Sequence, residues 1–324
     1  MSTSLSAPAR IRSAVSHPGA GVVIAFAVLV IFLSIVTPRF MTLDNIVVVL
    51  RQSVVVGVMA IGMTFVIGMG GIDLSVGAIL GITGVATAAM IQDGVNIYLA
   101  IIAGPALGLV IGLLNGLLIT IFKLPPFIAT LGTMSLLRGL IYVFTQGIPI
   151  YGLRYPEFQF VGQGFLWIVP FPVVVFAILV AVFSYVLYRT RLGRYTLSIG
   201  SNPTAARLVG IGVSRTKVVV YAISGLLCGV AGVILTSRSE AAAPDAGLGV
   251  ELDVIAATII GGTAMTGGRA VMFGTVIGAV LMTTIRNGLN LLGVSPLWHQ
   301  VVIGAFIIAA VAASSWSKNR SAED

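Results

Sequence analysis

Long apolar runs, separated by short polar stretches, fill almost the whole chain. A charged side chain is costly in hydrocarbon, so the gaps between charges mark candidate membrane spans. Most gaps are long enough for one helix of about 20 residues. They predict about ten spans, at residues 20–37, 52–72, 74–92, 97–122, 126–147, 164–188, 218–237, 254–268, 270–285 and 297–316. The pattern therefore predicts an all-α polytopic membrane protein, with residues 1–324 as a single transmembrane domain.

Three of these runs differ from an ordinary span. Residues 254–268 and 270–285 are shorter than the roughly 17 to 25 residues that usually cross a membrane, so either could be re-entrant. Residues 20–37 could be mistaken for a signal peptide. Because their apolar run is long and no small-residue cleavage site follows, we expect a retained helix.

The composition supports a membrane protein. Of the 324 residues, 58% are hydrophobic and 9% are charged, and the mean hydropathy is +1.10. Soluble domains carry about 25% charged residues, which argues against a soluble enzyme, a disordered chain or a nucleic-acid binder. The lone cysteine, Cys228, allows no intrachain disulfide and no zinc cluster. No P-loop sequence is present, so we expect no ATP or Mg²⁺ site in this chain.

The placement of the basic residues predicts an orientation. If the N-terminus is cytoplasmic, most of the 18 lysines and arginines fall in inner loops, and most acidic residues fall in outer ones. Cytoplasmic loops of membrane proteins carry this excess of positive charge. We therefore expect both termini in the cytoplasm, and we interpret the net charge of +8 as a topology signal rather than as a nucleic-acid surface.

The two halves of the chain resemble each other weakly. Residues 73–76 (DLSV) are similar to residues 251–254 (ELDV), and Gly108 and Gly112 match two later glycines, Gly274 and Gly278. If spans two to five correspond to spans seven to ten, the offset is odd and the repeat is inverted in the membrane, as in many transporters. Glycine at every fourth residue over 104–116 also predicts that this helix packs closely on another.

The largest polar insertion, residues 189–217, is predicted to contain a short cytoplasmic helix. Asn202 is a favourable N-cap and Pro203 suits the first helical position. Residues 204–209 can then form a helix, and Gly210 can end it. An ordinary solvated loop is the alternative interpretation.

Two motifs resemble those of a known family. The first is carried by Gly193, Gly200, Asn202, Ala205, Ala206, Gly210 and Ile211; the second by Gly70, Gly71, Ile72, Asp73, Leu74, Ser75, Val76 and Gly77. Both resemble hallmarks of the ribose-type permeases of ABC importers. Further matches at 115–116, 125–133, 260–262 and 267–268 follow in order, so the resemblance covers nearly the whole chain.

The resemblance implies a transport subunit of the bacterial inner membrane with no catalytic residues of its own. A separate ABC ATPase subunit would bind ATP and Mg²⁺, and a periplasmic binding protein would deliver a monosaccharide or polyol. A second permease copy would complete the pathway in the bilayer. The helix at 203–209 would couple the permease to the ATPase, with Arg207 beside the small residues Ala205 and Ala206.

Two charged residues within the predicted spans leave an alternative open. Asp73 could cap the third span, or it could belong to a gate or an ion pair. Arg138 could be a helix-pairing side chain, or it could line the pathway together with Thr130, Thr133 and His299, because the resemblance places spans five and ten beside the pathway. A stand-alone ion-coupled carrier would use Asp73 or Arg138, whereas a membrane enzyme has no constellation of reactive residues here.

The outer segments carry two further expectations. Tyr151, Tyr155, Phe158 and Phe160 are typical of an interfacial aromatic belt, with contact to the binding protein as the alternative. The acidic residues of the 238–253 loop are expected to be solvated or to steer that partner.

Overall fold

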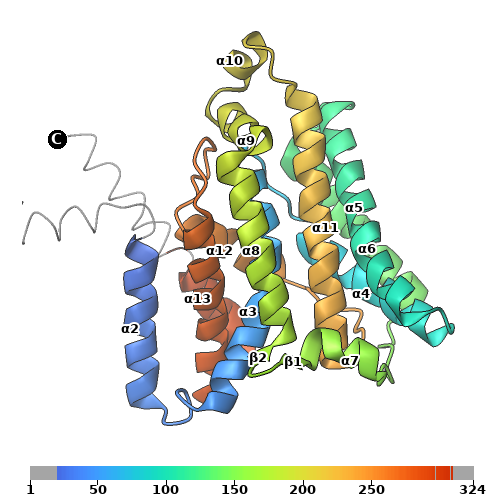
Figure 1. Cartoon of the computed structure of the whole chain (residues 1–324), viewed down its shortest axis with the longest axis vertical. Coiled ribbons are helices and arrows are strands. Elements are labelled where there is room, and N and C mark those ends of the chain that lie inside the picture. Colours follow the sequence, from blue (N-terminus) through green and yellow to red (C-terminus); the bar gives the residue numbers. More distant parts are fainter. Residues whose placement is uncertain (1–19, 296, 307, 309–324) are drawn as a thin grey trace, which may run out of the picture.

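The computed structural model describes residues 20–295, 297–306 and 308, which form a bundle of helices (Figure 1). The helices are α2 (Ala20–Val36), α3 (Leu43–Gly68), α4 (Val76–Gln92), α5 (Ile97–Thr120), α6 (Pro126–Thr145), α7 (Pro156–Gln163), α8 (Phe171–Arg189), α9 (Arg191–Ser201), α10 (Pro203–Leu208), α11 (Val213–Ser239), α12 (Val250–Ile260) and α13 (Met272–Leu291). A short hairpin pairs β1 (Phe165–Leu166) with β2 (Val169–Pro170). A further helix covers Leu297–Phe306 and is called the 297–306 helix below.

The prediction of an all-α polytopic membrane protein is confirmed. Six helices are long and apolar enough to cross a membrane: α3, α5, α6, α8, α11 and α13. Each of the ten predicted runs overlaps a described helix, but α12 has only 11 residues, so ten membrane spans remain a prediction. At 1.5 Å per residue it is about 16 Å long, roughly half the hydrocarbon thickness of a bilayer. The end of the predicted 297–316 run and both chain termini lie outside the described residues.

Taking charges as helix boundaries gave wrong limits for several spans. Helix α3 begins at Leu43 and includes Arg51, and α13 continues through Arg286 to Leu291. These arginines are tolerated because they have partners: Arg51 donates to the Gln163 carbonyl and lies 4.6 Å from the Phe165 ring centroid. The predicted start of span six at residue 164 is also wrong, because 165–170 form the hairpin before α8.

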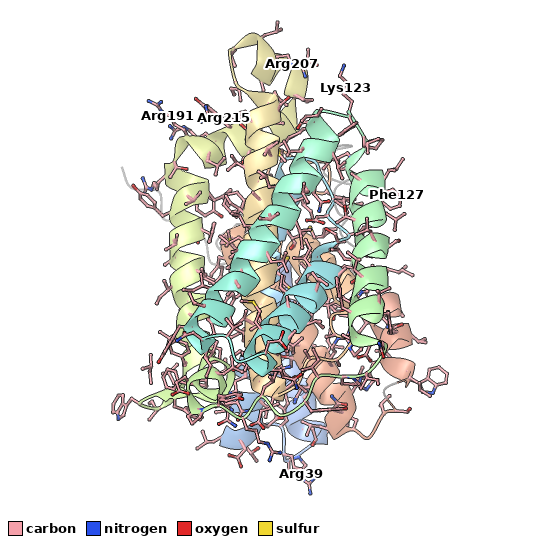
Figure 2. All side chains as sticks on the ribbon, turned by 90° about the vertical axis from the view of Figure 1, so that its right-hand side faces the viewer. Arg39, Lys123, Phe127, Arg191, Arg207 and Arg215 are labelled. Carbon is pink, nitrogen blue, oxygen red and sulfur yellow. The ribbon has the colours of Figure 1, made fainter. Side chains whose placement is uncertain are left out.

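The bundle has two distinct ends, which we name after the helices that cover them. Helices α9 and α10 lie at the α10 end, whereas α7 and the hairpin lie at the α7 end (Figure 1). Figure 2 shows Lys123, Arg191, Arg207 and Arg215 at the α10 end and Arg39 at the opposite end. The end that carries α10 therefore presents several basic residues, and its cytoplasmic orientation stays a prediction.

Helices α3 and α11 form the centre of the bundle, and glycines bring other helices against them. A Cβ added at Gly108 or Gly112 of α5 would collide with the backbone carbonyls of Gly225 and Tyr221 in α11. The predicted close packing of the 104–116 glycines is thus confirmed. In the second half of the chain, Gly278 of α13 meets the Ala257 carbonyl of α12 in the same way.

The neighbours of the two central helices follow an alternating pattern. Helices α4 and α5 pack against α11, whereas α12 and α13 pack against α3. Within each pair the two helices also contact each other. The first-half helices thus rest on the central helix of the second half, and the second-half helices rest on that of the first half.

Candidate functional site

Helix α10 is built as the sequence predicted. Asn202 Oδ1 accepts hydrogen bonds from the backbone N–H groups of Thr204 and Ala205, both at 3.0 Å. This satisfies two of the N–H groups that a helix start leaves free. At the other end Gly210 has φ +81°, a left-handed conformation that glycine adopts without strain. The result is a short rigid helix that protrudes from the bundle (Figure 1).

The two small residues of the predicted coupling helix are not both exposed. Ala205 and Arg207 are exposed, but Ala206 is buried against the chain itself, and its carbonyl accepts a bond from the Ile211 N–H at 3.0 Å. Leu208 and Val209 are instead 84% and 77% exposed. Sequence reasoning missed this pair, although two large apolar residues before a helix-ending glycine are unusual in a polar loop.

Glycines seat α9 and α10 on the bundle. A Cβ at Gly193 would strike the Leu187 carbonyl at the end of α8, and one at Gly200 would strike the Gly68 carbonyl and the Gly268 N–H. The Gly268 N–H donates to the Gly68 carbonyl at 2.9 Å. Three segments are therefore in direct backbone contact: the end of α3, the loop after α12, and α9. A displacement of α10 can be transmitted through these contacts into the bundle.

The 70–77 motif lies in the interior and is held by side-chain hydrogen bonds. Asp73 Oδ1 accepts from the Ser75 N–H at 3.0 Å and from the Ser75 hydroxyl at 2.5 Å, and the Ser224 hydroxyl donates to Oδ2 at 3.2 Å. Asn115 donates to Ser75 Oγ at 2.8 Å, and the Thr133 hydroxyl donates to Asn115 Oδ1 at 2.6 Å. We call this continuous chain of bonds from α11 to α6 the serine network.

The serine network accounts for several predicted site residues. Asp73 stands three residues before α4, is fully buried, and makes no ion pair with any described residue. Thr130 supports the same loop, because its hydroxyl oxygen accepts from the Leu74 N–H at 3.2 Å. Gly71 packs against the Tyr221 hydroxyl, and Gly77 against the Gly247 carbonyl. The motif and two of the four pathway candidates, Thr130 and Thr133, thus belong to one structural junction.

The other two pathway candidates lie apart from this junction. Arg138 of α6 donates to the Ala246 carbonyl at 2.7 Å, in the segment that leads into α12. His299 is buried in the 297–306 helix, with Nε2 3.2 Å from the Val294 carbonyl. The structure therefore does not gather all four residues at one place.

Sequence reasoning missed an ion pair within the bundle. Asp253 of α12 is only 2% exposed, so it is not a solvated residue of an outer loop. Its Oδ2 accepts from Arg286 of α13, at 2.8 Å from Nε and 2.7 Å from Nη2. In the weak repeat between the two halves of the sequence, Asp253 corresponds to Ser75. Each of these two residues receives a hydrogen bond from the long helix that follows, so the repeat was the sequence signal that could have revealed the pair.

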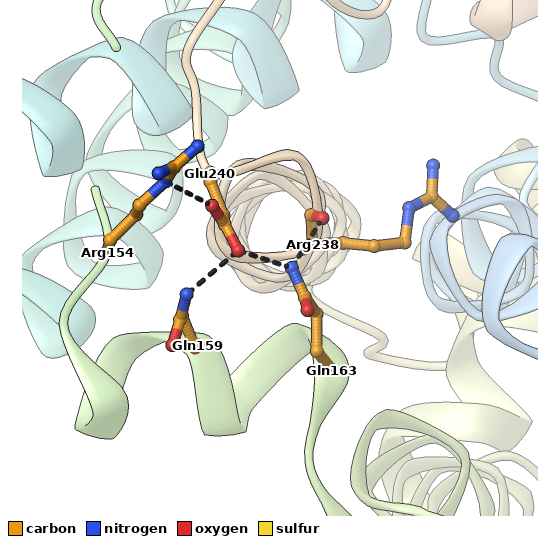
Figure 3. Close-up of polar contacts among 5 residues, drawn as sticks. All are labelled: Arg154, Gln159, Gln163, Arg238 and Glu240. Carbon is orange, nitrogen blue, oxygen red and sulfur yellow. Dashed lines mark hydrogen bonds and ion pairs between the residues drawn. The ribbon is translucent and has the colours of Figure 1, made fainter. Parts of the chain in front are cut away.

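At the α7 end, Glu240 organises a polar cluster (Figure 3). Its carboxylate accepts from Gln159 at 2.8 Å, from Gln163 at 3.2 Å and from Arg154 at 3.1 Å. The hydrogen bonds from Gln163 and Gln159, followed by the bond and charge of Arg154, lower the pKa of Glu240. The cluster fixes α7 to the end of α11. Of the four predicted belt residues, Tyr151, Tyr155 and Phe160 are exposed and Phe158 is buried.

This is the architecture of a membrane permease, and the similarity to known proteins identifies which kind. Residues 45–311 match the family described as branched-chain amino acid transport system / permease component. The chain is 48% identical to the ribose import permease of Bacillus subtilis over 285 residues, 88% of each chain. It is 42% identical to the ribose import permease of Escherichia coli K12 over 292 residues, 89% of this chain and 91% of the relative. It is 40% identical to the D-allose transport system permease of the same strain over 286 residues, 88% of this chain and 87% of the relative.

The chain therefore belongs to this family of ABC importer permeases, and to its ribose-type members. It is a transport component rather than an enzyme, as the sequence predicted. Membership favours the importer over the stand-alone ion-coupled carrier. No solved structure matches the chain.

Proposed function

We propose that this chain is the translocation subunit of an ATP-driven importer of a monosaccharide, meaning a ribose-like pentose, a hexose or a related polyol. The relatives named for ribose and allose import support the substrate class, because each aligns along most of its length. The observation that carries the proposal is α10: a capped, rigid helix at the basic end, with Leu208 and Val209 exposed.

We infer ten spans in two inverted halves, with both termini in the cytoplasm of a bacterial cell. The alternating packing of the helices supports the repeat, because an inverted pair of halves must exchange contacts across its axis. The short α12 then acts as half of a broken span, continued toward the α7 end by the non-helical segment 240–249. Such backbone is tolerated at membrane depth only where protein or water covers it.

The proposed partners bind at opposite ends. An ABC ATPase subunit, which holds ATP and Mg²⁺, receives α10, and a periplasmic sugar-binding protein docks on the α7 end. A second copy of the permease completes the pathway within the inner membrane. When ATP binding draws the ATPase domains together, the α10 helices move with them, and the route through Gly200, Gly68 and Gly268 carries that movement to α3 and α12. The pathway then alternates between its two openings.

A variant pair at Leu208 tests this function. Leu208→Ser removes the largest exposed apolar side chain of α10, and because Leu208 is 84% exposed the permease itself should remain folded. We expect the ATPase subunit to be lost when the tagged chain is purified in mild detergent, and ATP-dependent ribose uptake to fall about tenfold or more. Leu208→Met conserves volume and should keep both activities near wild type. Full ATPase recovery and uptake with Leu208→Ser would contradict the assignment of α10.

A further inference from the structure

A small cavity lies where α12 begins. Its volume is about 130 Å³, and it is lined by Gly249, Leu252, Asp253, Arg286, Gln300 and Ile303, from α12, α13 and the 297–306 helix. None of these residues is among those that the sequence suggested for the pathway. The cavity is also separate from the serine network, which is built around the 70–77 motif of the first half.

The polar groups of this cavity are only partly satisfied. Asp253 Oδ2 is paired with Arg286, but Oδ1 is buried and has no hydrogen-bond partner among the described residues. The Arg286 side chain remains 32% exposed although it forms an ion pair. Gln300 is exposed, and its Nε2 lies 3.1 Å from the position that a Cβ would take at Gly249. A guanidinium and an amide therefore stand beside the cavity with bonding capacity to spare.

The depth of the cavity makes these groups unusual. Arg286 lies five residues before the end of α13, about 8 Å along the helix from that end. Arg138 lies seven residues before the end of α6, about 10 Å along that helix, and reaches the 245–253 segment through Ala246. Charged side chains at such depth face the interior of a protein or a water-filled passage.

The cavity nevertheless opens at the lateral surface of this chain. Leu252 and Gln300, on its rim, are both exposed. Hydrocarbon against an arginine and a glutamine amide would leave their hydrogen bonds unmade at a cost of several kcal/mol. The rim must therefore face water or protein, which fits a passage between this chain and its second copy.

We propose that Arg286 and Gln300, held in position by Asp253, bind the hydroxyl groups of the sugar as it moves through the permease. This inference rests on the proposed function. A sugar hydroxyl both donates and accepts hydrogen bonds. It can accept a hydrogen bond from the guanidinium and exchange hydrogen bonds with the amide. A neutral polyol thus bonds both exposed groups without adding a net charge, so this site suits a sugar better than an ion.

A cysteine variant tests whether the cavity is wet and whether sugar reaches it. The chain has one cysteine, the fully buried Cys228, so Cys228→Ala gives a background for single cysteines. In the assembled transporter, we expect the Gln300→Cys thiol to react with a membrane-impermeant maleimide, and D-ribose to slow the reaction about tenfold. The matched control is Ile178→Cys, because Ile178 is 57% exposed and lies seven residues inside the α7 end of α8. We expect no reaction at that position.

Uptake kinetics provide the second readout. Gln300→Ala should raise the KM for ribose uptake by about tenfold, because a site built for hydroxyl groups loses a partner, while the complex still purifies intact. A reactive Gln300→Cys thiol without sugar protection, or an unchanged KM, would overturn only the proposed binding of sugar by Arg286 and Gln300. A wild-type complex that imports none of ribose, allose and arabinose in the presence of ATP would instead overturn the proposed function, and this binding site with it.

Discussion

The two halves of this permease carry related four-residue motifs and use them differently. Residues 73–76 lead into α4, with a buried carboxylate that accepts its hydrogen bonds from serines. Residues 251–254 stand at the start of α12, where Asp253 replaces Ser75 and pairs with an arginine beside an open cavity. In both halves a polar side chain of the next long helix bonds the third residue of the motif, Asn115 in one and Arg286 in the other.

This difference separates a motif that holds helices together from a motif that is placed to contact a ligand. The serine network consists of neutral donors matched to one carboxylate, and it joins α11, α5 and α6 through the motif. Such a fully satisfied buried network makes an arrangement rigid. The Asp253 pair keeps an unused oxygen and a partly exposed guanidinium, which is expensive at this depth unless the groups have a function.

The largest expected effect comes from the helix contacts that the two halves share. Gly108→Ala and Gly278→Ala each place a Cβ against a backbone carbonyl of another helix, in α11 and α12 respectively. The helices must move apart, and we expect a loss of about 3 kcal/mol or more, seen as aggregation during purification. Gly139→Ala is the control, because nothing lies within 4 Å of its Cβ. Normal yields for both interior variants would contradict the shared scaffold.

A smaller effect should distinguish the two carboxylates. Asp253→Asn leaves the Arg286 charge without its partner, and breaking a buried pair in this way costs about 3–5 kcal/mol in fully buried cases, so we expect the lower end here. Asp73→Asn keeps most of its hydrogen bonds and should cost about 1–2 kcal/mol. Thermal unfolding in detergent measures both. The double variant Asp253→Asn with Arg286→Gln should recover part of the stability, whereas a greater loss for Asp73→Asn would reverse the assigned roles.

Much of this contrast lay beyond what the sequence could predict. Apolar runs predicted the helices, glycine spacing predicted the α5 packing, and Asn202 followed by Pro203 predicted the cap, because each depends on residues close together in the chain. Span limits failed at Arg51 and Arg286, since a distant partner decides whether an arginine ends a helix. The Asp253 pair and the exposed face of α10 depend on tertiary packing, which turns Ala206 inward and Leu208 outward.

The serine network should also have a measurable role of its own. Asn115→Ala removes the bonds to Ser75 and Thr133 together, leaving buried groups unpaired. We expect a loss of about 1–2 kcal/mol in thermal unfolding, with the helices still assembled. Asn290→Ala, at an exposed position of α13, is the control and should stay within about 0.5 kcal/mol of wild type. Equal losses of stability for the two variants would mean that the serine network does not stabilise the fold.

The smallest effect concerns the α7 end, where a half-buried cluster with one exposed arginine contrasts with both buried motifs. Because hydrogen bonds from Gln163 and Gln159, and then Arg154, lower the pKa of Glu240, the unfolded chain binds this proton more readily than the folded chain. The contribution is therefore complete above the ordinary value of 4.5 and is lost as pH falls through the lower folded pKa. We expect the unfolding temperature of wild type to fall toward that of Glu240→Gln when the pH drops from about 6 to about 3.5. The two should differ only slightly even at pH 6, since exposed ion pairs contribute little. A gap between them that widens in acid would contradict this role of Glu240.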